Sequence, residues 1–335
     1  MKATIYDVAR EAGVSIAAVS QVINGKGKIS EERRQEIIRV MEMLHYQPSR
    51  IASALTGKKT YTIGLLVPDI SNPFFAEIAR AVEEQGHQLG YSLIICSTEN
   101  KDERVERYIS LLQQKSVDGI IIGTGIDNKK MLKPFLDNET PIAMIAREMP
   151  GLDVKTVIVD DYVGGRMAAE HLLALGHRRL AVLTENPKLS SSKERIRGFR
   201  EGVELSGGEL PDSRIKACGD ELVKEGKRLA AQLLQCEDPP TAIFCCNDLL
   251  AIGTLQAAKQ LGMKVPSDLS VIGFDNTILA SVTDPPLTTV AQPTERMGRT
   301  AVDRLIGQLD KAYDGELRTV MQPNLVVRSS TAAPL

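Results

Sequence analysis

The chain has 335 residues, which allows roughly two domains at about 150 residues per domain. Its composition, 43% hydrophobic and 25% charged, excludes an intrinsically disordered chain. Its apolar runs have the length of strands and are too short to span a bilayer. The N-terminal residues are polar and amphipathic, with no apolar signal segment, and the five cysteines have no CxxC spacing. We therefore expect a cytoplasmic protein with free thiols and no membrane partner.

Charge is distributed unevenly along the chain. Residues 1–60 carry ten Lys/Arg and six Asp/Glu, a net charge of +4, whereas the remainder carries 31 and 37, a net charge of −6. A small basic segment joined to a larger acidic one is typical of a polyanion-binding module fused to a second domain. A solvated basic face would give the same count, so charge alone does not decide between the two.

The first 46 residues predict three short helices. Thr4 and Asp7 fit a capping box, and the helix that follows ends at Gly13. A second helix is expected over 16–23, and a third begins after Ser30 with two acidic residues in its first turn. A helix, a tight turn, a second helix and a supporting helix are the helix-turn-helix arrangement, which places the second helix in the major groove of DNA. The alternative is a three-helix subdomain without a ligand.

From residue 61 onward, short apolar strands alternate with helices. This alternation predicts parallel sheets with both faces covered, and the pattern restarts after about residue 161, which indicates two similar α/β lobes. The expected strands are 63–67, 93–96, 119–122, 142–145, 157–159, 180–183, 242–245, 271–274 and 289–291, and 325–327 is strand-like. The expected helices include 73–89, 104–115, 163–175, 249–261 and 295–309.

Polar side chains directly follow several of these strands. Ligands of open α/β sheets bind beyond the carboxyl ends of the strands, so Arg147, Asn247 and Asp275 are candidate ligand contacts. Carboxylates and Arg make charge-assisted hydrogen bonds that suit hydroxyl-rich ligands. Asp160 and Asp248 follow strands too, but each also directly precedes a helix and serves equally well as a helix cap.

Several segments of the chain resemble the LacI/GalR family of bacterial transcriptional regulators. They are IYDVAREAGVS, AVSQVING, HYQPSRIASALTG, SNPFF, VDG, EHLLALGH, CCNDLLAIG, VIGFDNT and PPLTTVAQP, and they span nearly the whole chain. The resemblance implies an all-α helix-turn-helix DNA-binding domain (1–47), a hinge (48–60) and an α/β two-lobe periplasmic-binding-protein-like (type I) domain for effector binding and dimerisation (61–335). Lobe 1 is expected at about 61–161 and 292–321, and lobe 2 at about 162–291 and 322–335.

The resemblance implies DNA contacts from the second helix, its flanks and the hinge. Gln21 stands where many relatives have Arg; Gln pairs with adenine as Arg pairs with guanine, although a phosphate contact or plain solvent exposure is the alternative. Leu55 falls where relatives wedge a Leu between base pairs in the minor groove. The expected DNA-contacting residues are Thr4, Tyr6, Ser15, Ile16, Ala17, Ser20, Gln21, Asn24, Ser30, Arg50, Ala52 and Leu55.

The resemblance also implies a small-molecule effector bound between the two lobes. Arg195 and Asp275 are the principal expected contacts, and the full set is Asn72, Phe74, Phe75, Arg147, Asp160, Arg195, Asn247, Asp275 and Gln292. A carbohydrate is the expected ligand, whereas a nucleobase, which the adjacent Phe residues also suit, or a partner protein is the alternative. No cofactor, metal ion or catalytic residue is expected.

These inferences predict a transcriptional regulator, most simply a repressor, that binds a pseudo-palindromic site on double-stranded DNA as a homodimer. An enzyme is disfavoured because the chain has no Walker A, GxGxxG, GxSxG or HExxH motif. A secreted solute-binding protein would share the two-lobe body, but the predicted helix-turn-helix and the missing signal peptide disfavour it. Whether the effector releases the protein from DNA or holds it there is left open.

Overall fold

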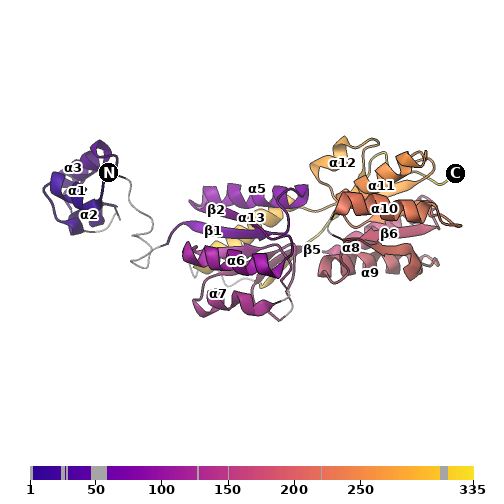
Figure 1. Cartoon of the computed structure of the whole chain (residues 1–335), viewed down its shortest axis with the longest axis horizontal. Coiled ribbons are helices and arrows are strands. Elements are labelled where there is room, and N and C mark those ends of the chain that lie inside the picture. The colour runs from indigo at the N-terminus through magenta and orange to yellow at the C-terminus, as the bar shows by residue number, and fades with distance from the viewer. Residues whose placement is uncertain are drawn as a thin grey trace. The chain divides into compact units, whose positions relative to one another are not determined.

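The structure is a computed structural model that describes residues 3–23, 27, 29–46, 59–126, 128–149, 151–219, 221–309 and 316–335. The chain divides into two compact units, Met1–Thr60 and Tyr61–Leu335, and each is described by itself. In the part of the chain that the structure describes, no helix is long and apolar enough to cross a membrane. The elements of both units are labelled in Figure 1.

The first unit holds three helices, α1 (Ile5–Glu11), α2 (Ile16–Ile23) and α3 (Glu31–Met43). Thr4 and Asp7 form the predicted capping box, in which the Thr4 amide donates to the Asp7 carboxylate at 3.0 Å. Gly13, at φ +62°, makes the turn into α2, since glycine adopts this backbone conformation without a steric penalty. The helices pack around Val8, Val19 and Ile37, which are completely buried.

The second unit contains two six-stranded sheets, which form two lobes. In the first, β1 (Thr62–Val67), β2 (Ser92–Ser97), β3 (Gly119–Ile122), β4 (Ile142–Ile145), β5 (Lys155–Val159) and β11 (Arg318–Met321) are parallel, in the order β11-β5-β4-β3-β1-β2. In the second, β6 (Leu180–Thr184), β7 (Ile215–Ala217), β8 (Ala242–Cys245), β9 (Ser270–Asp275), β10 (Thr288–Ala291) and β12 (Asn324–Val326) have the order β12-β10-β9-β8-β6-β7. Only the β10–β12 pair of this sheet is antiparallel among the described strands.

Helices cover both faces of each sheet (Figure 1). The first sheet has α5 (Pro73–Gln88) and α13 (Thr294–Leu309) on one face, and α6 (Asp102–Gln114), η1 (Lys129–Leu132) and α7 (Lys133–Asp137) on the other. The second has α10 (Leu222–Leu234), α11 (Asp248–Gln260) and α12 (Ile278–Val282) on one face, and α8 (Asp161–Ala174) and α9 (Ser190–Leu205) on the other. The short η2 (Asp212–Arg214) precedes β7.

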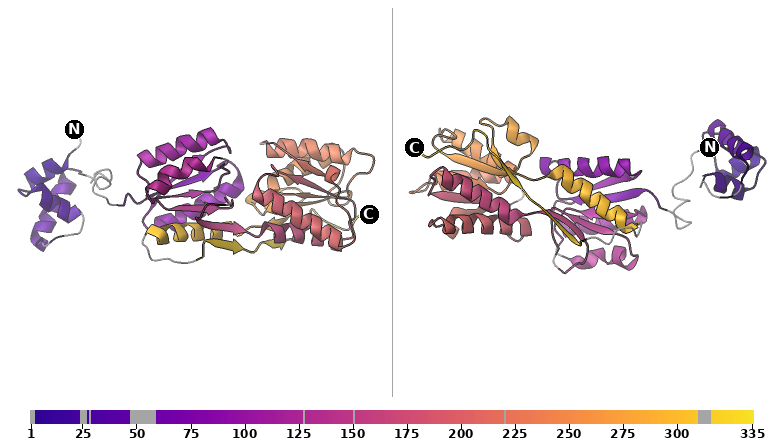
Figure 2. Two further views of the ribbon diagram at one scale, coloured as in Figure 1. Left: turned by 90° about the horizontal axis from the view of Figure 1, so that it is seen from below. Right: turned by 180° about the vertical axis from the view of Figure 1, so that it is seen from behind.

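The chain crosses between the two sheets at three places. It passes from β5 to α8, from β10 to α13, and from β11 directly into β12, which Figure 2 shows as a single stretch of chain. Each lobe is therefore built from separate parts of the sequence. The carboxyl ends of the parallel strands in both sheets lead into the region where the lobes meet.

Two glycines allow α8 and α9 to pack closely. A Cβ atom at Gly165 would lie 2.1 Å from the backbone oxygen of Arg195, and one at Gly198 would lie 2.0 Å from that of Tyr162. Real Cβ atoms do not approach backbone this closely, so only glycine fits at either position. This contact holds Arg195 of α9 beside Asp161, the first residue of α8.

Candidate functional site

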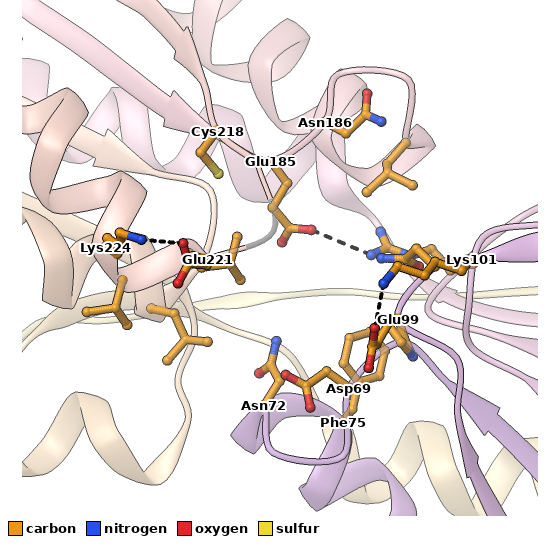
Figure 3. Close-up of a pocket in the computed structure, with 18 of the residues that line it drawn as sticks. Asp69, Asn72, Phe75, Glu99, Lys101, Glu185, Asn186, Cys218, Glu221 and Lys224 are labelled. Carbon is orange, nitrogen blue, oxygen red and sulfur yellow. Dashed lines mark hydrogen bonds and ion pairs between the residues drawn. The ribbon is translucent and has the colours of Figure 1, made fainter. Parts of the chain in front are cut away.

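A cavity of about 970 Å³ lies between the two lobes, at the carboxyl ends of their strands. From the first lobe, Asp69, Asn72 and Phe75 line it near the start of α5, and Arg147 lines it after β4. From the second lobe, Glu185 follows β6 directly and its carboxylate points into the cavity (Figure 3). This volume is in the range of small-molecule sites, which cover roughly 300–1,000 Å³.

Arg147 reaches from the first lobe to the second. Its Nη1 donates a hydrogen bond to the Ser191 hydroxyl, and its Nη2 lies 3.7 Å from Oε2 of Glu185. Arg147 is only 9% exposed, and among the described residues its buried Nε has no hydrogen-bond partner. Burial lowers the pKa of Arg147, and the Glu185 carboxylate opposes that shift. An unsatisfied buried donor costs about 1–3 kcal/mol, so the hydrogen-bonding capacity of this guanidinium is not fully used within the described residues.

Asn247 connects helix α11 to Glu185. Its side-chain oxygen accepts from the Leu250 amide at 2.8 Å and caps the helix, while its Nδ2 donates to Glu185 Oε1 at 2.6 Å. Asn247 is 2% exposed and does not line the cavity. It therefore orients a carboxylate that the sequence interpretation had missed. The signal that could have found Glu185 is the one that indicated Arg147: each is a charged residue that follows a predicted apolar strand.

Arg195 lies in a buried cluster beside the cavity. Its Nε donates to Asp161 Oδ1 at 2.7 Å, its Nη1 lies 3.8 Å from Asp275 Oδ1, and its guanidinium sits over the Phe274 ring at 3.7 Å. Gln292 donates to Asp275 Oδ1 at 2.7 Å. Burial acts to lower the pKa of Arg195, but Asp161 and Asp275 outweigh it, so the pKa is raised.

Asp275 occupies a strained part of this cluster. Its φ is +114°, and the next residue, Asn276, has φ +58°, both in the region that favours glycine. Arg328, beyond β12, supports this turn by donating to Asn276 Oδ1 at 2.6 Å. Burial raises the pKa of Asp275 well above its ordinary value, with Arg195 opposing. The surrounding contacts thus hold Asp275 in one orientation at the end of β9.

The structure does not bring all nine expected effector residues to the cavity. Asn72, Phe75 and Arg147 line it, and Arg195, Asn247, Asp275 and Gln292 are buried outside its lining. Phe74 packs in the core of the first lobe, edge-on to Phe75 at 5.0 Å between ring centroids.

Asp160 is the other expected residue outside this cavity. It caps α8 by accepting from the Val163 amide at 3.0 Å, and it lines a separate crevice of about 290 Å³.

In the first unit, the expected DNA-contacting side chains lie mostly at the surface. Tyr6 is 67% and Ile16 is 41% exposed, and Ala17 and Gln21 are exposed beside Ile16 on α2. Ser20 is partly buried. Thr4, Ser15 and Ser30 are exposed, and each side chain accepts from a backbone amide in the first turn of its helix. The expected contacts Asn24, Arg50, Ala52 and Leu55 lie outside the described residues.

Metal binding finds no support in the described part of the chain. There, no group of three or more His, Cys, Asp or Glu side chains is placed to hold a metal ion. The five cysteines are free thiols, and all except Cys236 are buried.

A helix-turn-helix unit followed by two α/β lobes that enclose a ligand-sized cavity defines the class of ligand-responsive transcription regulators. Residues 4–49 match the family model described as bacterial regulatory proteins, lacI family, and residues 169–331 match the periplasmic binding protein-like domain. The chain is 46% identical to the HTH-type transcriptional regulator DegA of Bacillus subtilis (strain 168), over 99% of each chain. It belongs to the LacI family of bacterial regulatory proteins.

Two further similarities agree with this assignment. The chain is 35% identical to the ribose operon repressor of Halalkalibacterium halodurans, over 98% of this chain and 97% of that protein. Among solved structures, it is similar to the Lac repressor dimer bound to operator and the anti-inducer ONPF, with a TM-score of 0.88 and 28% identity over 99% of this chain and 100% of that one. The expected family, fold class and role in DNA-binding regulation are thereby confirmed.

Proposed function

We propose that this protein is a repressor whose affinity for operator DNA is set by a small carbohydrate bound in the interlobe cavity. The observation that carries the proposal is the meeting of Arg147 from one lobe with Ser191 and Glu185 from the other at the edge of that cavity. A ligand that contacts these groups touches both lobes at once. Its binding energy therefore depends on how far the lobes are closed, which is the requirement for an effector.

A hydroxyl-rich ligand fits the donors and acceptors of the cavity. Asn72 and Arg147 offer amide and guanidinium groups, Asp69 and Glu185 offer carboxylates, and Phe75 supplies an apolar ring for a sugar face. The relative from Halalkalibacterium halodurans is named a ribose operon repressor, which supports a sugar. We propose Asn72, Phe75, Arg147 and Glu185 as direct contacts in the present arrangement of the lobes. In this proposal, the buried residues beside the cavity position the contact residues without touching the ligand; they are Arg195, Asn247, Asp275 and Gln292.

The DNA-binding half of the proposal rests on α2. Ile16, Ala17 and Gln21 are exposed on this helix, whose other side packs Val19 and Val22 against the core of the unit. The Lac repressor structure that resembles this chain is a dimer bound to operator. We propose the same assembly here, since a two-fold dimer presents two recognition helices to two half-sites. The hinge contacts proposed for Arg50, Ala52 and Leu55 stay predictions.

Regulation, with no catalysis, is the proposed role, and the relatives are likewise named as transcriptional regulators and repressors. The test begins by selecting bound sequences from random double-stranded DNA with the full chain. A thermal-shift screen against sugars, sugar phosphates, sugar acids and nucleobases follows, because a ligand at 100 times its Kd should stabilise the folded protein by about 2.7 kcal/mol. Operator affinity is then measured with and without each hit. A protein that selects no sequence, or whose operator affinity no ligand changes, would contradict the proposal.

A further inference from the structure

Arg147 and Glu185 face each other across the lobes with their hydrogen-bonding capacity only partly used. The 3.7 Å between Nη2 and Oε2 is too long for a hydrogen bond. Within the described residues, the Nε of Arg147 has no partner, and the only hydrogen bond to Glu185 comes from Asn247 to Oε1. A donor and an acceptor with unused capacity thus meet at the wall of one cavity, which both residues line.

The charged side chains that line the cavity are four carboxylates and three cations: Asp69, Glu99, Glu185 and Glu221, and Lys101, Arg147 and Lys224. Lys101 is ion-paired with Glu99 at 2.8 Å, and Lys224 with Glu221 at 2.6 Å (Figure 3). Arg104, outside the lining, shares Glu99 at 2.6 Å. The Asp69 carboxylate accepts hydrogen bonds from the amide and hydroxyl of Ser71. An anion that approached the Arg147 guanidinium would therefore meet the Glu185 carboxylate beside it.

In the buried cluster beside the cavity, Arg195 already has its partners within the protein. It lies between Asp161, at 2.7 Å, and Asp275, at 3.8 Å, so two acidic side chains share this guanidinium. Arg195 is 7% exposed, and its Nη1 donates to the backbone oxygen of Cys246. Its charge is consequently already used within the protein and is not free to receive a ligand anion.

We infer that Glu185 determines the charge class of the effector, admitting a neutral hydroxyl group at Arg147 and excluding a carboxylate or phosphate there. A hydroxyl both accepts and donates, so it can accept from Arg147 and donate to Oε2 of Glu185. An ionised carboxylate or phosphate only accepts, and it would lie against the like charge of Glu185. This inference rests on the proposed function, since it takes the cavity as the effector site.

The test compares sugars with their acidic counterparts on the same carbon skeleton. Calorimetry on the full chain would use D-glucose, D-gluconate and D-glucose 6-phosphate, D-galactose and D-galacturonate, and D-ribose and D-ribose 5-phosphate. We expect at least one neutral sugar to bind, and its acidic counterparts to bind at least about tenfold more weakly, the effect of one unfavourable polar contact. Glu185→Gln keeps the shape of the side chain and removes its charge, so the ratio of the two affinities should fall at least about tenfold.

Two matched variants test whether the effect comes from a negative charge at position 185 in particular or from the total negative charge of the cavity. Glu221→Gln removes the same charge from the same cavity, but at a residue that pairs with Lys224, and the affinity ratio should stay within about twofold of the wild type. Glu185→Asp keeps the charge at this position and should still exclude the acidic sugars. Melting curves confirm that each variant is folded, and Glu185→Asp keeps the inference testable if Glu185→Gln does not fold.

Three results would overturn the inference. The first is a wild type that prefers an acidic sugar to its neutral counterpart. The second is an equal change of the affinity ratio in Glu185→Gln and Glu221→Gln. The third is that no compound of the series binds. Measuring operator binding with the same protein preparation distinguishes a failure of this inference from a failure of the proposed function. Retained binding to a selected DNA sequence leaves the regulatory function standing while the assignment of Glu185 falls, whereas loss of sequence-specific binding removes the proposed function itself.

Discussion

Asn247 serves α11 and Glu185 at the same time: its side-chain oxygen caps the helix, and its amide nitrogen holds the Glu185 carboxylate at 2.6 Å. One side chain therefore both caps a helix and orients a carboxylate that lines the cavity. The strand β8 ends just before Asn247, so the end of the strand, the start of the helix and the orientation of Glu185 are linked in the fold.

Asn247→Ala should weaken both the fold and the site. Loss of the cap costs about 1 kcal/mol, and freeing Glu185 removes the contact that orients it toward the cavity. We expect a lower free energy of unfolding in urea and weaker binding of whichever sugar the wild type binds. Ser30→Ala, which removes a cap from α3 in the other unit, is the control and should leave sugar binding unchanged. Equal sugar affinity in wild type and Asn247→Ala would contradict the positioning role.

Gly165→Ala should be among the most damaging single substitutions in the second unit. Its Cβ would lie 2.1 Å from the Arg195 backbone oxygen, so α8 and α9 would have to separate, at a cost of about 3 kcal/mol or more. Gly86→Ala in α5 is the matched control, because its nearest neighbour would be 3.7 Å away and alanine favours helix by about 1 kcal/mol. Urea unfolding should show opposite signs for the two variants, and similar effects would contradict this packing account.

His177 should make the second unit less stable in mild acid. Its Nε2 donates to the Ala332 backbone oxygen at 2.8 Å, and its Nδ1 lies 2.9 Å from the Thr241 hydroxyl, from which it accepts when the ring is neutral. Burial lowers the pKa of His177, so the unfolded chain binds the proton more readily, and stability present above a pH of about 6.5 is lost as the pH falls. The difference in unfolding free energy between wild type and His177→Gln should shrink from pH 7.5 to 5.5. A constant difference would show that His177 does not titrate this way.

Gln21→Arg should change which base is preferred at one position of each half-site. Gln pairs with adenine and Arg with guanine in the major groove, and a good pair discriminates by about 1–3 kcal/mol. Sequence selection from random DNA with both proteins measures the change directly. Gln35→Arg, at an exposed position on α3, controls for the added charge and should strengthen binding without altering base preference. An unchanged preference in Gln21→Arg would indicate that Gln21 contacts phosphate or solvent.

Much of the fold could be predicted because its signals are local. Capping by Thr4 and Ser30 and the turn at Gly13 mark the first helices, and the central strands are unbroken apolar runs because both their faces are buried. The predictions missed β7 and β11, which lie at or near sheet edges. Both are only three or four residues long and contain exposed or partly buried charged side chains, such as Arg318, so they lack the apolar pattern.

The candidate site was predictable only in part, because a strand end indicates a position but not the direction of a side chain. Phe74 and Phe75 are adjacent on α5 and both pack in the core of the first lobe, but successive helical residues point about 100° apart, and only Phe75 also lines the cavity. Asp160 is used as a helix cap. Glu185 follows its strand as Arg147 does, but its importance depends on a contact between lobes that no local pattern records.

The most direct test of the central claim measures how a bound sugar changes operator affinity in wild type and Arg147→Ala. Fluorescence anisotropy with a labelled, selected operator gives Kd for each protein with and without the sugar that calorimetry identifies. We predict a change of about tenfold or more in the wild type, within the usual range of allosteric coupling. Arg147→Ala should bind free operator as the wild type does and show no response to the sugar. An equal response in both proteins, or none in the wild type, would contradict control through this cavity.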